Sequence, residues 1–78
     1  MARLRLFAQA RESAGTGEVR IDGGTVGEVL DSAVERYGSQ FAAVIGISAI
    51  WLNGEPASRD LSVGDGDEVA VLPPVSGG

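Results

Sequence analysis

The sequence predicts an α+β domain in which one main amphipathic helix packs on one face of a mixed sheet of four or five strands. Three observations predict this class: apolar residues that alternate near both ends of the chain, one helical stripe between them, and turn residues that separate short segments. One stripe and one sheet face can cover each other, so helix on sheet is the economical arrangement. The 78 residues suffice for one domain, which we assign to residues 1–72, followed by a flexible C-terminal tail at 73–78.

Two strands are predicted before the helix. Residues 3–8 read Arg-Leu-Arg-Leu-Phe-Ala, which places both leucines and Ala8 on an inner face and both arginines and Phe7 on the outer face. Residues 9–14 contain good helix formers and predict one short helical turn before a glycine. Residues 18–22 predict the second strand, because two β-branched residues there alternate with charged ones.

The helix is predicted from Thr25 to Gly38. Thr25 is a typical N-cap, and Glu28 stands three residues later, at the spacing of a capping box. Apolar residues then recur at helical spacing, namely Val26, Val29, Leu30, Ala33, Val34 and Tyr37. Gly38 is the expected residue after the helix. Residues 39–46 are apolar without a clear period and are predicted as a loop with a partial helical turn.

The remaining strands follow turn signals. Residues 48–52 predict a third strand, and the Asn53-Gly54 pair after it is the strongest short hairpin signal. Residues 55–57 can return as a very short strand, which Pro56 confines to the sheet edge. Residues 68–72 predict the last strand, and Pro73 stops it.

Composition excludes most classes of chemistry. The chain has no cysteine and no histidine, and all six of its basic residues are arginines, so Cys-His and Ser-His-Asp nucleophiles, the usual zinc sites, the P-loop and Schiff-base lysines are excluded. A net charge of −5 argues against binding of nucleic acid or of an anionic membrane. We therefore expect a cytoplasmic protein that holds no metal and no intrinsic cofactor and is not an enzyme on its own.

The remaining reactive group is the C-terminal carboxylate at the end of Pro-Pro-Val-Ser-Gly-Gly. Six extended residues span about 20 Å, and the two glycines have no Cβ to obstruct a narrow channel. A carboxylate becomes electrophilic only after coupling to a leaving group such as AMP, which a separate ATP-using enzyme would supply. The alternative is an ordinary frayed terminus.

Two segments resemble one known family, the small subunit of molybdopterin synthase. Its N-terminal signature resembles residues 6–15, Leu-Phe-Ala-Gln-Ala-Arg-Glu-Ser-Ala-Gly, and its C-terminal signature resembles residues 66–78. The resemblance implies a ubiquitin-like β-grasp fold and a sulfur carrier. It also implies that a ubiquitin-activating-type enzyme uses ATP to adenylate Gly78, that a sulfur donor converts the adenylate to a thiocarboxylate, and that Gly77 eases passage of the tail. The acceptor would be the large synthase subunit, where the sulfur forms the dithiolene of molybdopterin.

A partner surface is expected near the tail. If the first and last strands are parallel neighbours, Phe7 and Leu72 share one end of the sheet on the face away from the helix, and Trp51 can join them. We assign partner contacts to this set: Phe7, Trp51, Leu72, Pro73, Pro74 and Val75. The alternative for Phe7 and Trp51 is a place in the core. Three other functions also stay open, which are a sulfur carrier for another pathway (cysteine, thiamine, a thiolated metabolite or tRNA), a ubiquitin-like protein modifier, and a binding module with an inert tail.

Overall fold

The structure is a computed structural model that describes residues 1–74. Within that range it contains five strands and three helices. In chain order they are β1 (Ala2–Leu6), α1 (Ala8–Ala14), β2 (Glu18–Ile21), α2 (Val26–Tyr37), α3 (Ser39–Gly46), β3 (Ala49–Leu52), β4 (Glu55–Pro56) and β5 (Glu68–Leu72). None of these helices is long and apolar enough to cross a membrane.

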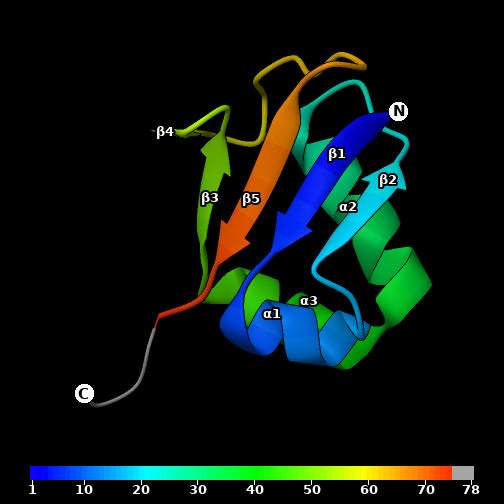
Figure 1. Ribbon diagram of the computed structural model, residues 1–78, viewed down its shortest axis with the longest axis vertical. Coiled ribbons are helices and arrows are strands. Elements are labelled where there is room, and N and C mark those ends of the chain that lie inside the picture. The colour runs from blue at the N-terminus through cyan, green and yellow to red at the C-terminus, as the bar shows by residue number, and fades with distance from the viewer. Residues whose placement is uncertain (75–78) are drawn as a thin grey trace.

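The strands form one mixed sheet in the order β2-β1-β5-β3-β4 (Figure 1). The first and last strands, β1 and β5, are parallel neighbours in its middle, so the condition on which the expected partner surface depended is met, and Leu6 lies opposite Val71. All other pairs are antiparallel. Because β1 and β5 run in the same direction, the chain leaves both strands at the same end of the sheet.

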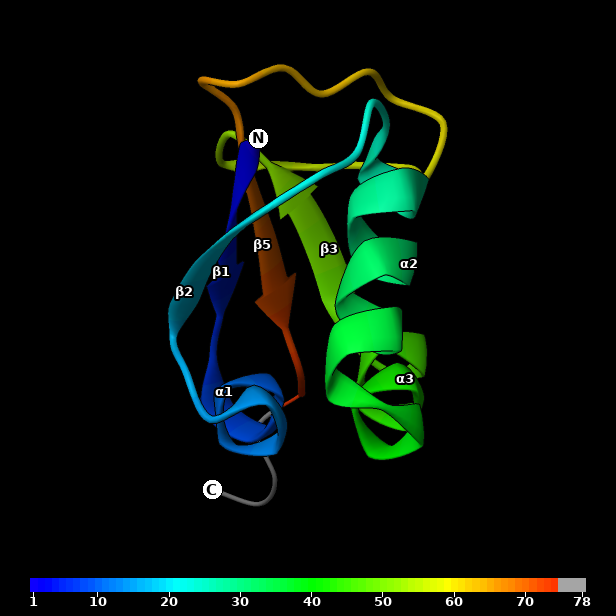
Figure 2. The ribbon, with the colours of Figure 1, turned by 90° about the vertical axis from the view of Figure 1, so that its right-hand side faces the viewer.

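The helices lie on one side and at one end of the sheet. Figure 2 shows α2 and α3 against one face, with α1 below the end of β1. The core lies between these layers and includes fully buried side chains from β1, β5 and α2, among them Leu4, Val69 and Leu30. The opposite face of the sheet is not covered by any element within residues 1–74.

The start of α2 confirms the predicted cap. The hydroxyl of Thr25 accepts a hydrogen bond from the Glu28 backbone amide at 3.1 Å. The Glu28 carboxylate reaches back to the amide of Gly24 at 2.8 Å, one residue before the N-cap, so the second bond of the capping box is shifted by one position. Of the predicted stripe, Val26, Val29, Leu30 and Ala33 are buried.

Residues 39–46 are a helix, and the prediction of a loop with a partial turn was wrong. Phe41 is fully buried and packs against Tyr37 of α2 with ring centroids 5.2 Å apart. Gly38 adopts φ +98°, a conformation open mainly to glycine, which allows α3 to start directly after α2. Tertiary packing of Phe41 therefore decides this segment.

The first strand is shorter than predicted. It ends at Leu6, and Ala8 is exposed and begins α1 with φ +49°, so its placement on the inner face of a strand was wrong. The helical turn expected at residues 9–14 is a seven-residue helix that ends at Gly15, where φ is +78°. The sequence therefore underestimated helix on both sides of α2.

The hairpin between β3 and β4 confirms the Asn-Gly prediction. Asn53 and Gly54 both have positive φ, +50° and +84°, as a type I′ turn requires. The Asn53 side chain also accepts a hydrogen bond from the Glu68 amide at 2.9 Å and donates one to Asp67 at 3.0 Å. The hairpin is thereby joined to the beginning of β5.

Candidate functional site

The candidate site lies where β5 leaves the sheet. Leu72 ends the strand, Pro73 is buried and Pro74 is exposed. The other expected tail residues, Val75, Gly77 and Gly78, lie outside the described residues. The site that the structure describes is therefore the root of the tail and the surface around it.

Phe7 and Leu72 lie side by side at this end of the sheet. Phe7 follows Leu6, the partner of Val71, and its amide donates a hydrogen bond to the Val71 carbonyl at 3.3 Å. Alternation along β1 and β5 directs both side chains away from the helices, and they are 39% and 36% exposed. Phe7 is thus on the surface and not in the core.

Trp51 lies on the same side of the sheet, the face that no helix covers, which we call the open face, and it is half-buried. It pairs with Ala70, two residues before Leu72, and with Pro56 across the hairpin. Its neighbours on β3, Ile50 and Leu52, face the helices and pack against the core. Trp51 therefore extends the apolar part of the open face away from the tail root without entering the core.

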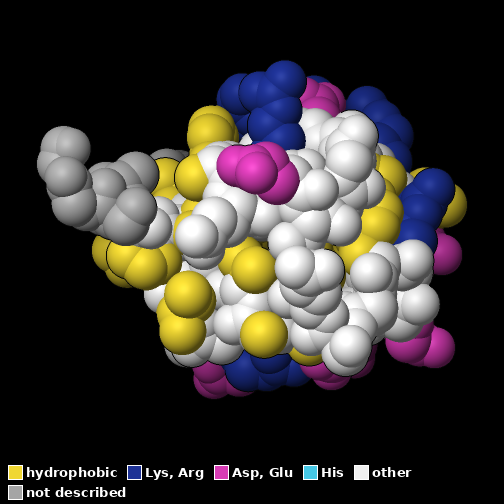
Figure 3. All heavy atoms as spheres, turned by 90° about the horizontal axis from the view of Figure 1, so that it is seen from below, with side chains coloured by type: hydrophobic (Ala, Val, Ile, Leu, Met, Phe, Trp, Pro, Cys, Tyr) yellow, Lys and Arg dark blue, Asp and Glu magenta, His cyan; other side chains and the backbone are white. Residues whose placement is uncertain are grey.

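The prediction from sequence missed Ile47. This residue follows α3, is 61% exposed and stands two positions before Ala49, which pairs with Leu72. The signal that could have indicated its exposure was a large apolar side chain between two elements and outside any predicted buried stripe. We call Phe7, Ile47 and Leu72 the tail-end patch. Seen from this end of the molecule, hydrophobic side chains gather beside the point where the described chain stops (Figure 3).

The rest of the open face is charged. Arg3 forms salt bridges with Glu18 at 3.3 Å and with Glu68 at 3.5 Å, and Arg5 lies 4.0 Å from the same Glu68 carboxylate. The Arg5 guanidinium also stands 5.4 Å from the centre of the Phe7 ring, at a cation–π distance. The charged area therefore joins the tail-end patch directly.

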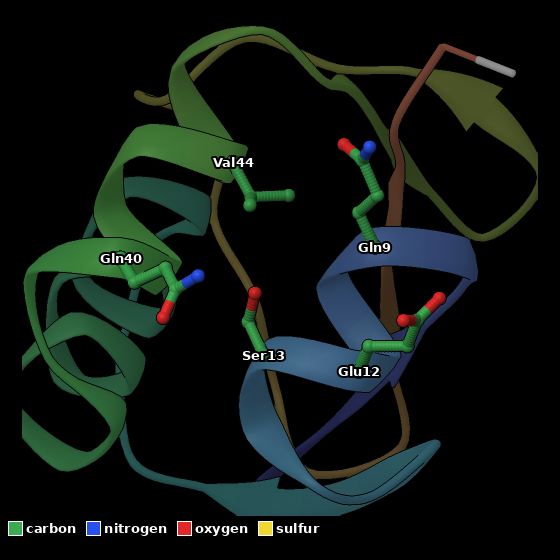
Figure 4. Close-up of a pocket in the computed structure, with 5 residues that line it drawn as sticks. All are labelled: Gln9, Glu12, Ser13, Gln40 and Val44. Atoms are coloured by element: carbon green, nitrogen blue, oxygen red, sulfur yellow. The ribbon is translucent and has the colours of Figure 1, made fainter. Parts of the chain in front are cut away.

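A groove lies between α1 and α3, near the root of the tail. Its volume is about 500 Å³, and its lining residues are Gln9, Glu12, Ser13, Gln40 and Val44. Side chains from the two helices face the space between them (Figure 4). The lining has one hydroxyl, on Ser13, and one carboxylate, on Glu12, but within residues 1–74 no hydrogen bond joins them as a nucleophile–base pair requires. Within residues 1–74, no group of His, Cys, Asp or Glu side chains is close enough to hold a metal ion.

The fold and the position of the tail root define a ubiquitin-like β-grasp protein. The profile of the ThiS family matches residues 4–78, and the chain belongs to that family of ubiquitin-like sulfur carriers and modifiers. Small archaeal modifier protein 1 of Haloferax volcanii is 37% identical over 95% of this chain and 97% of its own. A crystal structure of that protein matches with a TM-score of 0.86 and covers 99% of this chain and 98% of the other.

Two further solved structures extend the comparison. The putative molybdopterin converting factor subunit 1 of Pyrococcus furiosus is 28% identical, with a TM-score of 0.75 and coverage of 95% and 97%. The complex of subunits 1 and 2 of molybdopterin-converting factor from Helicobacter pylori contains a chain of the same fold, 24% identical with a TM-score of 0.71, with 99% of this chain and 97% of that one covered. The fold therefore occurs in a chain that is bound to a partner protein.

Proposed function

We propose that this chain is the sulfur-carrying small subunit of molybdopterin synthase and that Gly78 carries the sulfur. One observation carries the proposal: β5 leads the chain out of the sheet next to an exposed apolar patch, in a protein whose family consists of sulfur carriers and modifiers. An activating enzyme can dock on the patch and receive the terminal glycines in its own active site. The residues of this chain then supply the docking surface and the carboxylate.

The chemistry needs two displacements at the end of the chain. In the first, a Gly78 carboxylate oxygen attacks the α-phosphorus of ATP held by the activating enzyme, and pyrophosphate leaves. In the second, sulfide attacks the acyl carbon, the bond to the AMP oxygen breaks, AMP leaves, and a thiocarboxylate forms. Because glycine has no Cβ, Gly77 and Gly78 can enter a channel too narrow for other residues.

The acceptor that we propose is the large subunit of molybdopterin synthase. Two segments support it, residues 6–15 and 66–78, which resemble the signatures of the small subunit. The Pyrococcus furiosus relative, named as a molybdopterin converting factor subunit, supports it as well. The first of these segments includes Phe7 and all of α1, so it lies at the tail-end patch.

A second candidate function is that of a ubiquitin-like protein modifier. The observation that favours it is the 37% identity to a protein named small archaeal modifier protein 1. A modifier would use the same adenylate, but a lysine amine of a target protein would attack the acyl carbon in place of sulfur. Both functions require a free Gly78 carboxylate, and they differ in the acceptor.

The first experiment is intact mass spectrometry of the chain after incubation with its activating enzyme, ATP and a sulfide source. We expect one oxygen to be replaced by sulfur, with the change localised to Gly78 by fragmentation. A chain that lacks Gly77 and Gly78 is the control and should remain unchanged. If the full chain also remains unchanged, the carrier function is wrong.

A second step separates the two candidates. The thiocarboxylate form is mixed with the large synthase subunit and the molybdopterin precursor. Separately, the unmodified chain is mixed with the activating enzyme, ATP and a protein extract from the same organism. Molybdopterin formation with return of the carboxylate supports the proposal. Isopeptide adducts on target lysines without molybdopterin formation would instead establish the modifier.

A further inference from the structure

The arginines of the open sheet face are arranged against the usual rule for neighbouring strands. Arg3 of β1 pairs directly with Arg20 of β2, and Arg5 follows two residues later on the same face. Like charges directly opposite each other on a sheet are destabilising. All three side chains are exposed, so each could have been replaced by a neutral residue without loss of core packing. Arg3 and Arg5 gain salt bridges within the sheet, but Arg20 makes none within residues 1–74, so its position opposite Arg3 is a local conflict of the kind that is typical of a functional surface.

The acidic residues of this face do not neutralise the cluster. Glu18 and Glu68 form their salt bridges with Arg3 and Arg5. Within residues 1–74, Arg20 makes no salt bridge. Asp65, which lies close enough to Arg20 for their charges to interact, pairs at 2.6 Å with the amino group of Met1. Among the strand residues of the open face, three arginines stand against two glutamates, a local charge of +1, although the chain carries −5. The remainder of the chain therefore carries −6, and the molecule is electrically polarised.

We infer that the enzyme that activates this chain has carboxylates beside the apolar socket that receives the tail-end patch, and that these carboxylates contact Arg3, Arg5 and Arg20. The inference rests on the proposed function, because it concerns the partner that docks on that patch. Arg5 connects the tail-end patch with the arginine cluster. Its guanidinium lies over the Phe7 ring, and Arg3 and Arg20 lie next to it on β1 and β2. A partner placed on Phe7 and Leu72 therefore extends over the cluster.

The polarity has a consequence for the encounter between the two proteins. An acidic partner surface repels most of this chain and attracts only the open sheet face. The approach that brings that face forward also brings forward the tail root, which lies at its lower end. Charges arranged in this way accelerate association more than they slow dissociation, and the gain falls as salt is added.

The test compares two charge reversals that change the net charge equally. Arg20→Glu lies in the cluster, and Arg36→Glu lies on α2, on the helix side of the molecule. Association with the activating enzyme is measured by stopped flow at low and at high ionic strength. We expect Arg20→Glu to slow association about tenfold at low salt and to flatten the salt dependence, with Arg36→Glu within about twofold of the natural chain.

The stability of the Arg20→Glu chain is a second measurement, and it should not fall although association slows. Arg20→Glu replaces a like-charged pair with an opposite one across β1 and β2, so the midpoint of denaturant unfolding should stay the same or rise. Slower association in a fold of equal or greater stability excludes a merely structural effect.

Two results have separate meanings. If the natural chain binds the enzyme and both reversals have equal effects, net charge alone matters and this inference is wrong. If the natural chain does not bind at all, the proposed function fails before the inference is reached.

Discussion

Side chains along β1 alternate between the core and the open face of the sheet. Leu4 and Leu6 are buried under the helices, whereas Arg3, Arg5 and Phe7 stand on the opposite side. Phe7 is the last residue before α1, and its backbone amide is tied to Val71. A change to its side chain therefore alters the surface more than the fold.

We expect Phe7→Asp to weaken binding of the activating enzyme by at least about thirtyfold, the effect of losing an interface anchor worth roughly 2 kcal/mol. The unfolding free energy should change by less than about 1 kcal/mol, because the ring is already substantially exposed. Isothermal titration calorimetry and urea unfolding measure the two quantities.

Leu61→Asp is a matched control for this variant. Leu61 is 41% exposed, close to the 39% of Phe7, but it lies in the connection between β4 and β5, away from the tail-end patch. It should leave binding intact. A Phe7→Asp chain that unfolds, or a Leu61→Asp chain that binds equally poorly, would contradict the docking role of Phe7.

At the scale of elements, the start of α2 is held by the connection between β4 and β5. The amides of Val26 and Gly27, which have no partner within the helix, donate to the carbonyls of Leu61 and Arg59 at 2.9 and 2.8 Å. The Arg59 side chain reaches the Gly27 carbonyl and the Asp31 carboxylate. Gly27 is buried beneath this contact, which explains a glycine inside a helix.

Two glycine-to-alanine variants test this explanation. A Cβ at Gly27 would lie 3.2 Å from the Arg59 carbonyl oxygen, whereas a Cβ at Gly46 of α3 would meet nothing within 4 Å. Gly27→Ala should lower the unfolding free energy by about 1 kcal/mol, because crowding outweighs the gain in helix propensity. Gly46→Ala should leave stability unchanged or raise it by up to about 1 kcal/mol. Equal gains in both variants, measured by urea unfolding, would show that the Arg59 contact yields easily.

At the scale of the whole molecule, stability depends on pH through carboxylates that join segments. Hydrogen bonds from the Gly64 amide at 2.8 Å and from the Asn53 side chain at 3.0 Å hold the pKa of Asp67 below its usual value of 3.8. A lowered pKa in the folded state means that the ionised form stabilises the fold above pH 3.8. That stabilisation is lost as the pH falls through the folded-state pKa.

We expect Asp67→Asn to be less stable than the natural chain near pH 7, with the difference shrinking as the pH falls below 3.8. Thermal unfolding followed by circular dichroism between pH 7 and pH 2 measures it. Glu55→Gln is the control, because within residues 1–74 the Glu55 side chain takes part in no hydrogen bond or salt bridge with the protein. A constant difference between Asp67→Asn and the natural chain at all pH values would contradict the role of the ionised carboxylate.

The sequence predicted the strands and the main helix because their periods are local properties. The alternation of β1, the cap of α2 and the Asn53-Gly54 turn each depend on residues that are close together in the sequence. It did not predict α3, whose stability comes from Phe41 packing against Tyr37, or the end of β1 at Leu6, where a positive φ at Ala8 starts a helix. Those outcomes depend on contacts between elements.

The candidate site was predictable in part for the same reason. Alternation placed Phe7 and Leu72 on the open face once the parallel pairing of β1 and β5 was assumed. Ile47 was missed because its position depends on where α3 ends and β3 begins. The pairing of Arg3 with Arg20 was also beyond the sequence, since it depends on the register between β1 and β2.

The parallel pairing of β1 and β5 also has a mechanical consequence. The chain enters β1 at one end of the sheet and leaves β5 at the other, so a pull on the tail against the N-terminus slides the two strands past each other. In that geometry the hydrogen bonds between the strands bear the load together and not one after another. We therefore expect forced unfolding in this direction to need more force than peeling a strand from the edge of the sheet. If the terminal glycines enter a partner's channel as proposed, the tail leads into it from a strand in the middle of the sheet and not from one at its edge.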